Sequence, residues 1–265
     1  MLKKKKSEIK ENNNFEVAIL NENSSFQVKE AYKTLRTNIL FSLPKNLPSK
    51  VIAFVSACPG EGKTTTVINT AISFIELGKK IIVIDCDLRK PKLHKYMGIR
   101  AKSGLSNILG GFSELRECIT KTEYGFDCIT AGRIPPNPSE LLVSEQFDET
   151  MESLKKVYDI ILIDTPPITI VSETSTIVSK VDGTILIASS GKSAKTDFER
   201  AISILKFSNS KILGFVLNNS QNSNNSYGNT SYSRFFRKSP SYYYYNYGYG
   251  TNSSNNKYTD DNDIN

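Results

Sequence analysis

The sequence feature that most constrains the fold of this chain is the segment ACPGEGKT at residues 57–64. It follows a short apolar run at 51–56, typical of a strand, and precedes apolar residues at helical spacing over 67–75, with Gly78 where that helix would stop. The segment is close to a phosphate-binding P-loop, with alanine at the first glycine position. Its glycines let backbone N–H groups converge on phosphate oxygens, and the helix N-terminus adds partial positive charge. The sequence therefore predicts a phosphate site, which we favour over an ordinary glycine-rich turn.

The same loop predicts how a nucleotide and its metal ion are held. The Lys63 ammonium is expected to reach the β- and γ-phosphates, and the Thr64 hydroxyl is expected to ligate Mg²⁺. ATP and Mg²⁺ are therefore the expected cofactors. The predicted nucleotide-binding residues are Pro59, Gly60, Glu61, Gly62, Lys63, Thr64 and Thr65.

Short β-branched runs alternate with helical patterns, which is typical of βαβ units and a parallel sheet. The runs are continuously apolar, as expected when helices cover both faces of the sheet. We therefore predict an α/β fold of the P-loop NTPase type, with a mostly parallel sheet flanked by helices. An amphipathic helix with Val28, Ala31, Tyr32, Leu35 and Ile39 on one face is expected before the first strand and ends before Pro44. The expected strands are 51–56, 81–85, 128–130, 160–164, 184–188 and 212–217.

Composition divides the chain of 265 residues into three segments. Residues 1–14 are basic and polar, and residues 15–218 hold the strands and helices of the P-loop domain. From 219 to 265 the chain is rich in Asn, Ser and Tyr and poor in aliphatic residues, so we predict a disordered tail. An adhesive low-complexity segment is the less favoured interpretation of its tyrosine cluster.

Charge, cysteine usage and hydrophobicity exclude several classes of protein. The 34 basic and 27 acidic residues give a net charge of +7, a modest excess, and we expect no nucleic acid partner. The four cysteines form no CxxC pair or His/Cys cluster of the kind that zinc needs. The longest apolar runs fall far short of the ~18–20 residues that cross a bilayer, and no apolar stretch follows the basic N-terminus as in a secretory signal. We expect a cytoplasmic protein.

Acidic side chains follow two of the expected strands. Asp85 ends the strand at 81–85, Asp87 comes two residues later, and Asp164 ends the strand at 160–164. Positions i and i+2 of a strand project from the same face, and the carboxyl ends of parallel strands border the ligand crevice of an α/β sheet. Carboxylate and hydroxyl oxygens suit the hard Mg²⁺ ion. We therefore predict that three carboxylates meet the P-loop at one edge of the sheet, rather than serving only to end strands.

Together these elements resemble the bacterial tyrosine kinases, which carry a P-loop, a Walker A′ strand of the form DxDxR and a Walker B strand. Here DCDLR at 85–89 and ILIDTPP at 161–167 match the second and third elements. EAYKTLRTN at 30–38 resembles the family's EARxxRTN helix, which packs subunits into a ring, with Tyr-Lys where a basic pair is common. GRIPPNPSELL at 132–142 resembles its GxxPPNPxELL segment, and the tyrosine-rich end resembles its autophosphorylation cluster.

The resemblance implies residue roles. Lys63 holds the phosphates, and Thr64, Asp87 and Asp164 organise Mg²⁺. Asp85 lies nearest the incoming hydroxyl, where we expect it to act as general base, because a phenol with a pKa of ~10 is a poor nucleophile at neutral pH. The implied catalytic residues are Lys63, Asp85, Asp87 and Asp164. The implied phosphoacceptors are Tyr242, Tyr243, Tyr244, Tyr245, Tyr247 and Tyr249, and the implied ring contacts are Glu30, Tyr32, Arg36 and Asn38.

The resemblance also implies a biological role. The chain would be an ATP-dependent protein-tyrosine kinase that autophosphorylates its C-terminal tyrosine cluster and regulates capsular or exopolysaccharide synthesis and export. Its partners would be a transmembrane modulator of the export system, further copies of itself in a ring, and a cognate tyrosine phosphatase. The modulator would hold it at the inner face of the cell membrane.

Two other functional classes remain open. Partition and septum-positioning ATPases, which act on DNA or membrane cargo, share the expected fold but usually carry a second lysine early in the P-loop, where this chain has Cys58. A non-catalytic ATP-dependent scaffold is the other alternative. The absent lysine and the tyrosine-rich tail favour the kinase.

Overall fold

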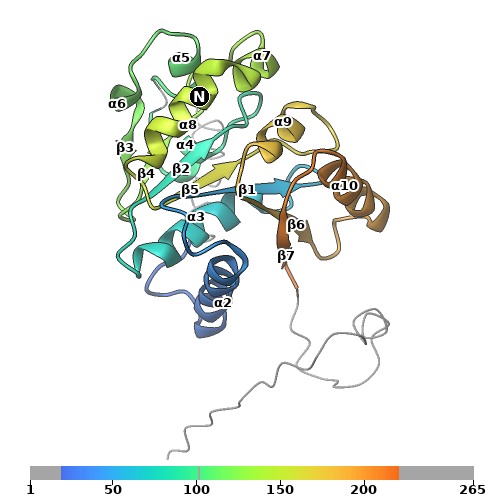
Figure 1. The fold of residues 1–265 in the computed structure, drawn as a ribbon. Coiled ribbons are helices and arrows are strands. Elements are labelled where there is room, and N and C mark those ends of the chain that lie inside the picture. Colours follow the sequence, from blue (N-terminus) through green and yellow to red (C-terminus); the bar gives the residue numbers. More distant parts are fainter. Residues whose placement is uncertain (1–18, 101, 221–265) are drawn as a thin grey trace, which may run out of the picture. The chain divides into compact units, whose positions relative to one another are not determined.

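The structure is a computed structural model that describes residues 19–100 and 102–220. Over these residues one seven-stranded sheet lies between two layers of helices (Figure 1). The predicted α/β fold with a mostly parallel sheet is confirmed. The expectations for the N-terminal segment and for the tail from residue 221, which contains every predicted phosphoacceptor, lie outside the described residues.

The strands run in the order β3-β4-β2-β5-β1-β6-β7, and every neighbouring pair is parallel except β3 with β4. All six predicted strands are present, each within one residue of its predicted ends. The short antiparallel strand β3 was not predicted, because two residues carry no periodic pattern. The bounds are β1 (Lys50–Ser56), β2 (Ile81–Asp85), β3 (Thr120–Lys121), β4 (Asp127–Ile129), β5 (Ile160–Asp164), β6 (Gly183–Ser189) and β7 (Ile212–Asn218).

Helices connect the strands on both faces of the sheet. None of them, in the part of the chain that the structure describes, combines the length and apolar character needed to span a bilayer. The two predicted helices are α2 and α3, and α2 ends just before Pro44 as expected. The bounds are α2 (Phe26–Ser42), α3 (Lys63–Ile75), α4 (Leu93–Tyr96), α5 (Leu105–Leu109), α6 (Leu115–Cys118), α7 (Pro138–Val143), α8 (Glu145–Lys155), α9 (Glu173–Ser179) and α10 (Lys195–Phe207).

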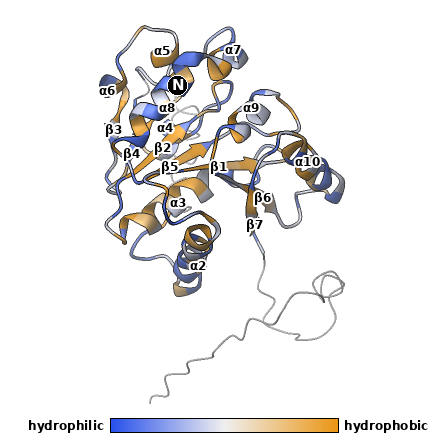
Figure 2. Ribbon diagram, viewed as in Figure 1, coloured by the Kyte–Doolittle hydropathy of each residue, from blue (hydrophilic) through white to orange (hydrophobic). Residues whose placement is uncertain are grey.

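The central strand β1 divides the core into two halves. Because successive side chains of a strand point to opposite faces, Val51, Ala53 and Val55 join one hydrophobic cluster, with side chains from α5, α7, α8, α9 and α10. Ile52 and Phe54 join the other cluster, with side chains from α2, α3 and α4. Burial on both faces explains why the central strands are uniformly apolar (Figure 2).

Helix α2 packs on α3 at the outside of the second cluster (Figure 1). Its predicted apolar face is buried only toward the C-terminal end, where Ile39 is 2% exposed, whereas Val28 remains 44% exposed. Phe26 and Phe41 are also largely exposed. The apolar surface of α2 therefore exceeds what α3 covers.

A glycine fixes the approach of α5 to the end of β4. Gly104 precedes α5, and a Cβ added there would collide with the carbonyl oxygen of Thr130 and the backbone nitrogen of Gly132. Since backbone atoms cannot rotate away, we expect Gly104→Ala to lower the free energy of unfolding by about 1–3 kcal/mol, as overpacking does. Urea denaturation measures this change.

Gly214→Ala is the matched control, because a Cβ at Gly214 would meet nothing within 4 Å. This substitution should change the stability by less than about 0.5 kcal/mol. Equal effects of the two variants would contradict the proposed steric constraint at Gly104.

Candidate functional site

The loop between β1 and α3 has the backbone geometry that phosphate binding requires. Gly60 and Gly62 have φ angles of 75° and 88°, in the left-handed region that residues with a Cβ rarely adopt. Gly62 is the N-cap of α3, and no side chain caps the helix there. The N-terminus of this 13-residue helix, with its partial positive charge, therefore faces the loop.

Lys63 and Thr64 both contact the carboxylate of Asp164. The Lys63 Nζ atom donates to Asp164 Oδ1 at 2.6 Å, and the Thr64 hydroxyl donates to Oδ2 at 2.6 Å. Lys63 is 9% exposed and Asp164 is 1% exposed, so this is a buried ion pair with both carboxylate oxygens engaged. The predicted meeting of the P-loop with the strand-ending Asp164 is present.

Asp85 lies next to Asp164 in the sheet but does not face the pocket. The two residues are register partners in β2 and β5. Asp85 is fully buried, and its carboxylate accepts from the backbone N–H groups of Asp87 (3.1 Å), Lys92 (3.2 Å) and Leu93 (3.1 Å). Burial, together with the nearby negative charge of Asp164, raises the pKa of Asp85 to about 8. Asp85 therefore fixes the loop that follows β2.

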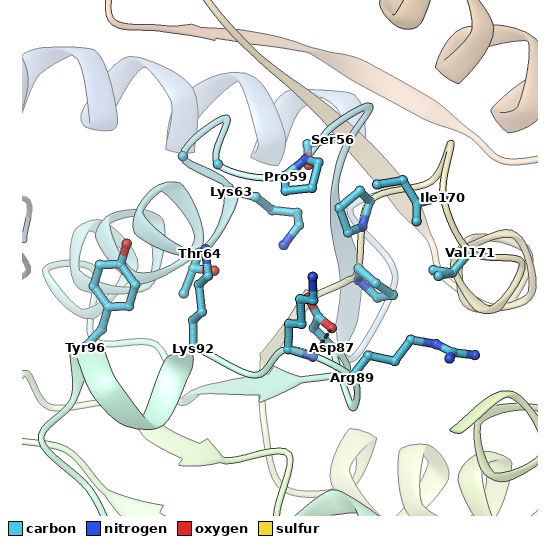
Figure 3. Close-up of a pocket in the computed structure, with 15 residues that line it drawn as sticks. Ser56, Pro59, Lys63, Thr64, Asp87, Arg89, Lys92, Tyr96, Ile170 and Val171 are labelled. Carbon is cyan, nitrogen blue, oxygen red and sulfur yellow. Dashed lines mark hydrogen bonds between the residues drawn. The ribbon is translucent and has the colours of Figure 1, made fainter. Parts of the chain in front are cut away.

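Asp87 is not on the same strand as Asp85, because β2 ends at Asp85. The same-face argument from sequence is wrong for this pair. Asp87 instead reaches the pocket from the loop, where its Oδ1 accepts from the Lys90 N–H at 2.9 Å. Arg89 also lines the pocket, and Figure 3 shows its side chain extending away from Lys63. Its Nε donates to Oε1 of Glu173, at the start of α9, at 2.7 Å.

A pocket of about 230 Å³ opens in front of the P-loop. Figure 3 shows Lys63 pointing into it, with Tyr96 on one side and Ile170 and Val171 on the other. Of the predicted nucleotide-binding residues, Glu61 and Thr65 do not line it. The lining residues are Ser56, Pro59, Gly60, Gly62, Lys63, Thr64, Asp87, Arg89, Lys90, Lys92, Tyr96, Pro166, Pro167, Ile170 and Val171.

The side chain of Glu61 supports the P-loop outside the pocket. It is 1% exposed and accepts from the Cys58 N–H at 2.8 Å and from the Ser193 hydroxyl. Lys192 donates to the Gly60 carbonyl at 2.9 Å, and Asn218 donates to the Glu61 carbonyl at 2.9 Å. Sequence reasoning missed these supports, because no local signal links residues near 192 and 218 to a loop at 60.

Two of the four expected ring contacts, Arg36 and Tyr32, lie against α3. Arg36 donates to the Ser73 carbonyl in the last turn of α3 and to Glu76 just beyond it. Tyr32 lies near Asn69 and Thr66 of α3, and burial raises the pKa of its hydroxyl. Glu30 pairs with Lys33 on the same helix at 2.8 Å, and Asn38 is exposed. The ring contacts stay a prediction.

The oxygen atoms around Lys63 fit Mg²⁺. Thr64 and Asp164 offer a hydroxyl and a carboxylate at the P-loop, and Asp87 brings a second carboxylate to the pocket. Among residues 19–100 and 102–220, no group of three or more His, Cys, Asp or Glu side chains forms a self-sufficient metal site. Mg²⁺ at nucleotide sites takes one or two carboxylates and completes its shell with phosphate oxygens and water.

Comparisons with known proteins identify relatives of the chain. A family model described as an AAA domain matches residues 49–206. The tyrosine-protein kinase YwqD of Bacillus subtilis is 40% identical over 191 residues, which are 71% of this chain and 80% of the relative. The kinase domain of the Escherichia coli tyrosine kinase ETK is 30% identical with a TM-score of 0.70, over 76% of this chain and 80% of that structure. The septum site-determining protein MinD of Pyrococcus horikoshii, complexed with Mg-ADP, is a more distant relative in fold, 27% identical with a TM-score of 0.56, over 66% of this chain and 72% of that structure.

The buried Asp85 predicts a pH dependence of stability. Its pKa of about 8 in the folded chain lies above the ordinary 3.8. The stability that Asp85 contributes is therefore fully present below about pH 4 and is lost as the pH rises toward 8. We expect the free energy of unfolding to fall over this range relative to that of Asp85→Asn, measured in urea without nucleotide or divalent metal.

The difference between the two proteins isolates Asp85, because His94, whose pKa is lowered by burial, titrates in both. Asn keeps one of the two acceptor oxygens, so the variant loses the contacts of the other oxygen, which will lower its stability by an amount that does not vary with pH. A constant difference between wild type and Asp85→Asn from pH 5 to pH 8 would contradict the raised pKa.

Proposed function

The chain belongs to the bacterial tyrosine-protein kinases, and on that premise we propose that it transfers the γ-phosphoryl group of ATP to the tyrosines of its own C-terminal cluster. The observation that carries the proposal is the buried cluster of Lys63, Thr64 and Asp164 at the P-loop, beside a pocket with a further carboxylate from Asp87. Phosphoryl transfer needs placement and charge more than covalent chemistry, and this cluster supplies both.

Separate groups of residues bind the phosphates, the metal ion and the loop itself. The N-terminus of α3 and the backbone between Gly60 and Thr65 bind the phosphates, and Lys63, which points into the pocket, adds a positive charge. Thr64, Asp87 and Asp164 would hold Mg²⁺, which would supply positive charge to neutralise the transferred group. The hydrogen bond from Ser193 to Glu61 keeps the P-loop preorganised, so that nucleotide binding requires little further ordering of the loop.

The wall of the pocket opposite Tyr96 suits an acceptor tyrosine. Pro166, Pro167, Ile170 and Val171 present apolar surface there, and Ile170 is 60% exposed. An aromatic ring packs favourably on such surface while its hydroxyl stays at the polar end of the pocket. We propose that this wall receives Tyr242, Tyr243, Tyr244, Tyr245, Tyr247 or Tyr249 of a neighbouring copy.

The carboxylate available to the incoming hydroxyl is that of Asp87. Asp85 is held by three backbone N–H groups and does not line the pocket, so its expected role as general base has no support from its position. We propose instead that Asp85 acts on the reaction through the loop that carries Asp87.

Partners and biological role follow from the family. We propose that identical chains assemble into a ring and that a transmembrane modulator of a capsular or exopolysaccharide export system binds the kinase at the inner face of the membrane. A cognate tyrosine phosphatase would reverse the modification. Phosphates on adjacent tyrosines add about −1.5 to −2 charges each, so repeated modification would weaken assemblies that the unmodified tails hold together.

Mass spectrometry of the tail tests the kinase proposal. After incubation of the full chain with Mg-ATP, with and without the cytoplasmic segment of a candidate modulator, we expect phosphate on tyrosines within 242–249. Lys63→Met should abolish it, because the substitution removes the charge that binds phosphate. Lys206→Met is the matched control, since Lys206 is exposed in the last turn of α10, and it should keep full phosphorylation.

ATP hydrolysis without phosphotyrosine, even with the modulator segment present, would favour the partition-type ATPase. Binding of ATP without any turnover would favour the scaffold. Either result would contradict the kinase proposal.

The metal dependence of the reaction tests the position of Asp87. We expect Asp87→Asn to raise the Mg²⁺ concentration for half-maximal phosphorylation by about tenfold or more, since one carboxylate ligand is lost. Asp127→Asn removes a carboxylate at the start of β4, at the opposite end of the sheet, and should leave the Mg²⁺ requirement unchanged. Equal Mg²⁺ requirements in wild type and Asp87→Asn would exclude Asp87 as a ligand.

A further inference from the structure

Two successive carbonyl groups of the P-loop accept hydrogen bonds from side chains that lie far away in the sequence. The Gly60 carbonyl accepts from Lys192 Nζ at 2.9 Å, and the Glu61 carbonyl accepts from Asn218 Nδ2 at 2.9 Å. Lys192 belongs to the turn after β6, and Asn218 is the last residue of β7. The carbonyl side of the loop is therefore fixed by the carboxyl ends of two strands.

The geometry of the peptide bond makes these contacts a constraint on the N–H groups of the loop. A trans peptide is planar, so its C=O and N–H groups point in opposite directions, and the described residues contain no cis peptide bond. The hydrogen bond to the Gly60 carbonyl therefore directs the Glu61 N–H to the opposite side. The hydrogen bond to the Glu61 carbonyl does the same for the Gly62 N–H. Neither N–H group has a hydrogen-bond partner among the residues that the structure describes, so both are available to an anion.

The two glycines of the loop make room for the two donors. A Cβ at Gly60 would lie too close to the Lys192 ammonium group, and a Cβ at Gly62 would lie too close to the Asn218 amide group. Both glycines line the pocket, whereas Lys192 and Asn218 do not. The donors thus contact the loop from outside the pocket and leave its inner side to the phosphates.

The turn that carries Lys192 is itself fixed by hydrogen bonds. The backbone N–H groups of Lys192 and Ser193 donate to the Ser189 carbonyl at 3.1 and 2.9 Å. The Ser193 hydroxyl accepts from the Ser189 N–H at 2.7 Å and donates to the side chain of Glu61. The turn after β6 therefore contacts the P-loop through two neighbouring side chains, which place the lysine beside Gly60.

We propose that Lys192 is a positioning residue for phosphate binding, because its contact with the Gly60 carbonyl directs the Glu61 N–H toward the nucleotide. The inference rests on the proposed nucleotide site and adds a residue to it. Glu61 lies between two pocket-lining glycines, and its side chain points elsewhere, so its N–H is the group that serves the pocket. Since the donor is an ammonium group, its hydrogen bond is charge-assisted and polarises the peptide, which strengthens the N–H as a donor. Lys192 thereby acts on the phosphates without touching them.

The affinity of the full chain for Mg-ADP, measured by isothermal titration calorimetry, tests the inference without requiring catalysis. Lys192→Met keeps most of the length of the side chain and removes the ammonium group. We expect it to raise the dissociation constant about three- to tenfold, the range that corresponds to one hydrogen bond. Lys195→Met is the matched control, since it removes the same charge from the first residue of α10, where the ammonium group pairs with Glu199 at 3.6 Å. It should change the affinity less than about twofold.

A second measurement separates positioning of the N–H group from general support of the fold. In amide NMR spectra of the wild-type chain, the Glu61 and Gly62 proton resonances should move downfield when Mg-ADP is added, because these N–H groups then donate to phosphate. In Lys192→Met the movement of the Glu61 resonance should be smaller. The melting temperature of the nucleotide-free variant should stay within about 2 °C of wild type, because the Lys192 contact is exposed.

The alternative results are distinguishable. Wild-type Mg-ADP affinity in Lys192→Met would overturn the inference, and so would an equal loss of affinity in Lys195→Met, since charge alone would then explain the effect. A loss of affinity with an unchanged movement of the Glu61 resonance would overturn the assigned positioning role. Failure of the wild-type chain itself to bind Mg-ADP would overturn the nucleotide site, and with it the proposed function, which none of the other results would do.

Discussion

The contact of Asp164 with Lys63 and Thr64 is the interaction on which the site depends. An ammonium group and a carboxylate buried this deeply are costly to desolvate, and removing either one from a buried pair typically costs about 3–5 kcal/mol. The pair persists because the carboxylate accepts from both P-loop side chains. It thereby fixes α3 and β5 to each other at the place where phosphate binds. Removing Asp164 would therefore disturb binding and folding together.

The order of the strands places this contact. β5 lies between β2 and β1, so the strand that ends in Asp164 is flanked by the strand that ends in Asp85 and by the strand that leads into the P-loop. Two carboxylates and one lysine then meet at a single edge. Burial of Asp85 and the proximity of Asp164 both raise the pKa of Asp85 and favour its protonated form, which limits the negative charge buried there.

Strands, helices and the chemistry of the P-loop could be read from the sequence because each has a local signal. Continuous apolar runs marked the six parallel strands, and the glycines at 60 and 62 marked the loop with left-handed backbone. Long-range partners had no such signal. Asn218 at the end of β7 and Ser193 in the loop after β6 support the P-loop, and only the folded sheet brings them there.

Two predictions from local sequence patterns were wrong or incomplete. The periodicity of a strand was extended two residues too far, so Asp87 was placed beside Asp85, whereas β2 ends at Asp85 and the backbone turns. The pattern of α2 identified its apolar face and its resemblance to a subunit contact. It gave no indication that Tyr32 and Arg36 turn inward to α3, since side chains of this kind suit either an interface or a helix–helix contact.

Asn218 contacts the P-loop and is also the last residue of β7, so the tyrosine cluster follows a strand that ends beside that loop. The segment 219–241 that separates the two would span on the order of 80 Å if fully extended. Under the proposed autophosphorylation, any active site within that radius, in the same chain or in another, would compete for the same tyrosines. The distances between tethering points in an assembly would then decide which chain receives the phosphate, because every copy offers the same chemistry.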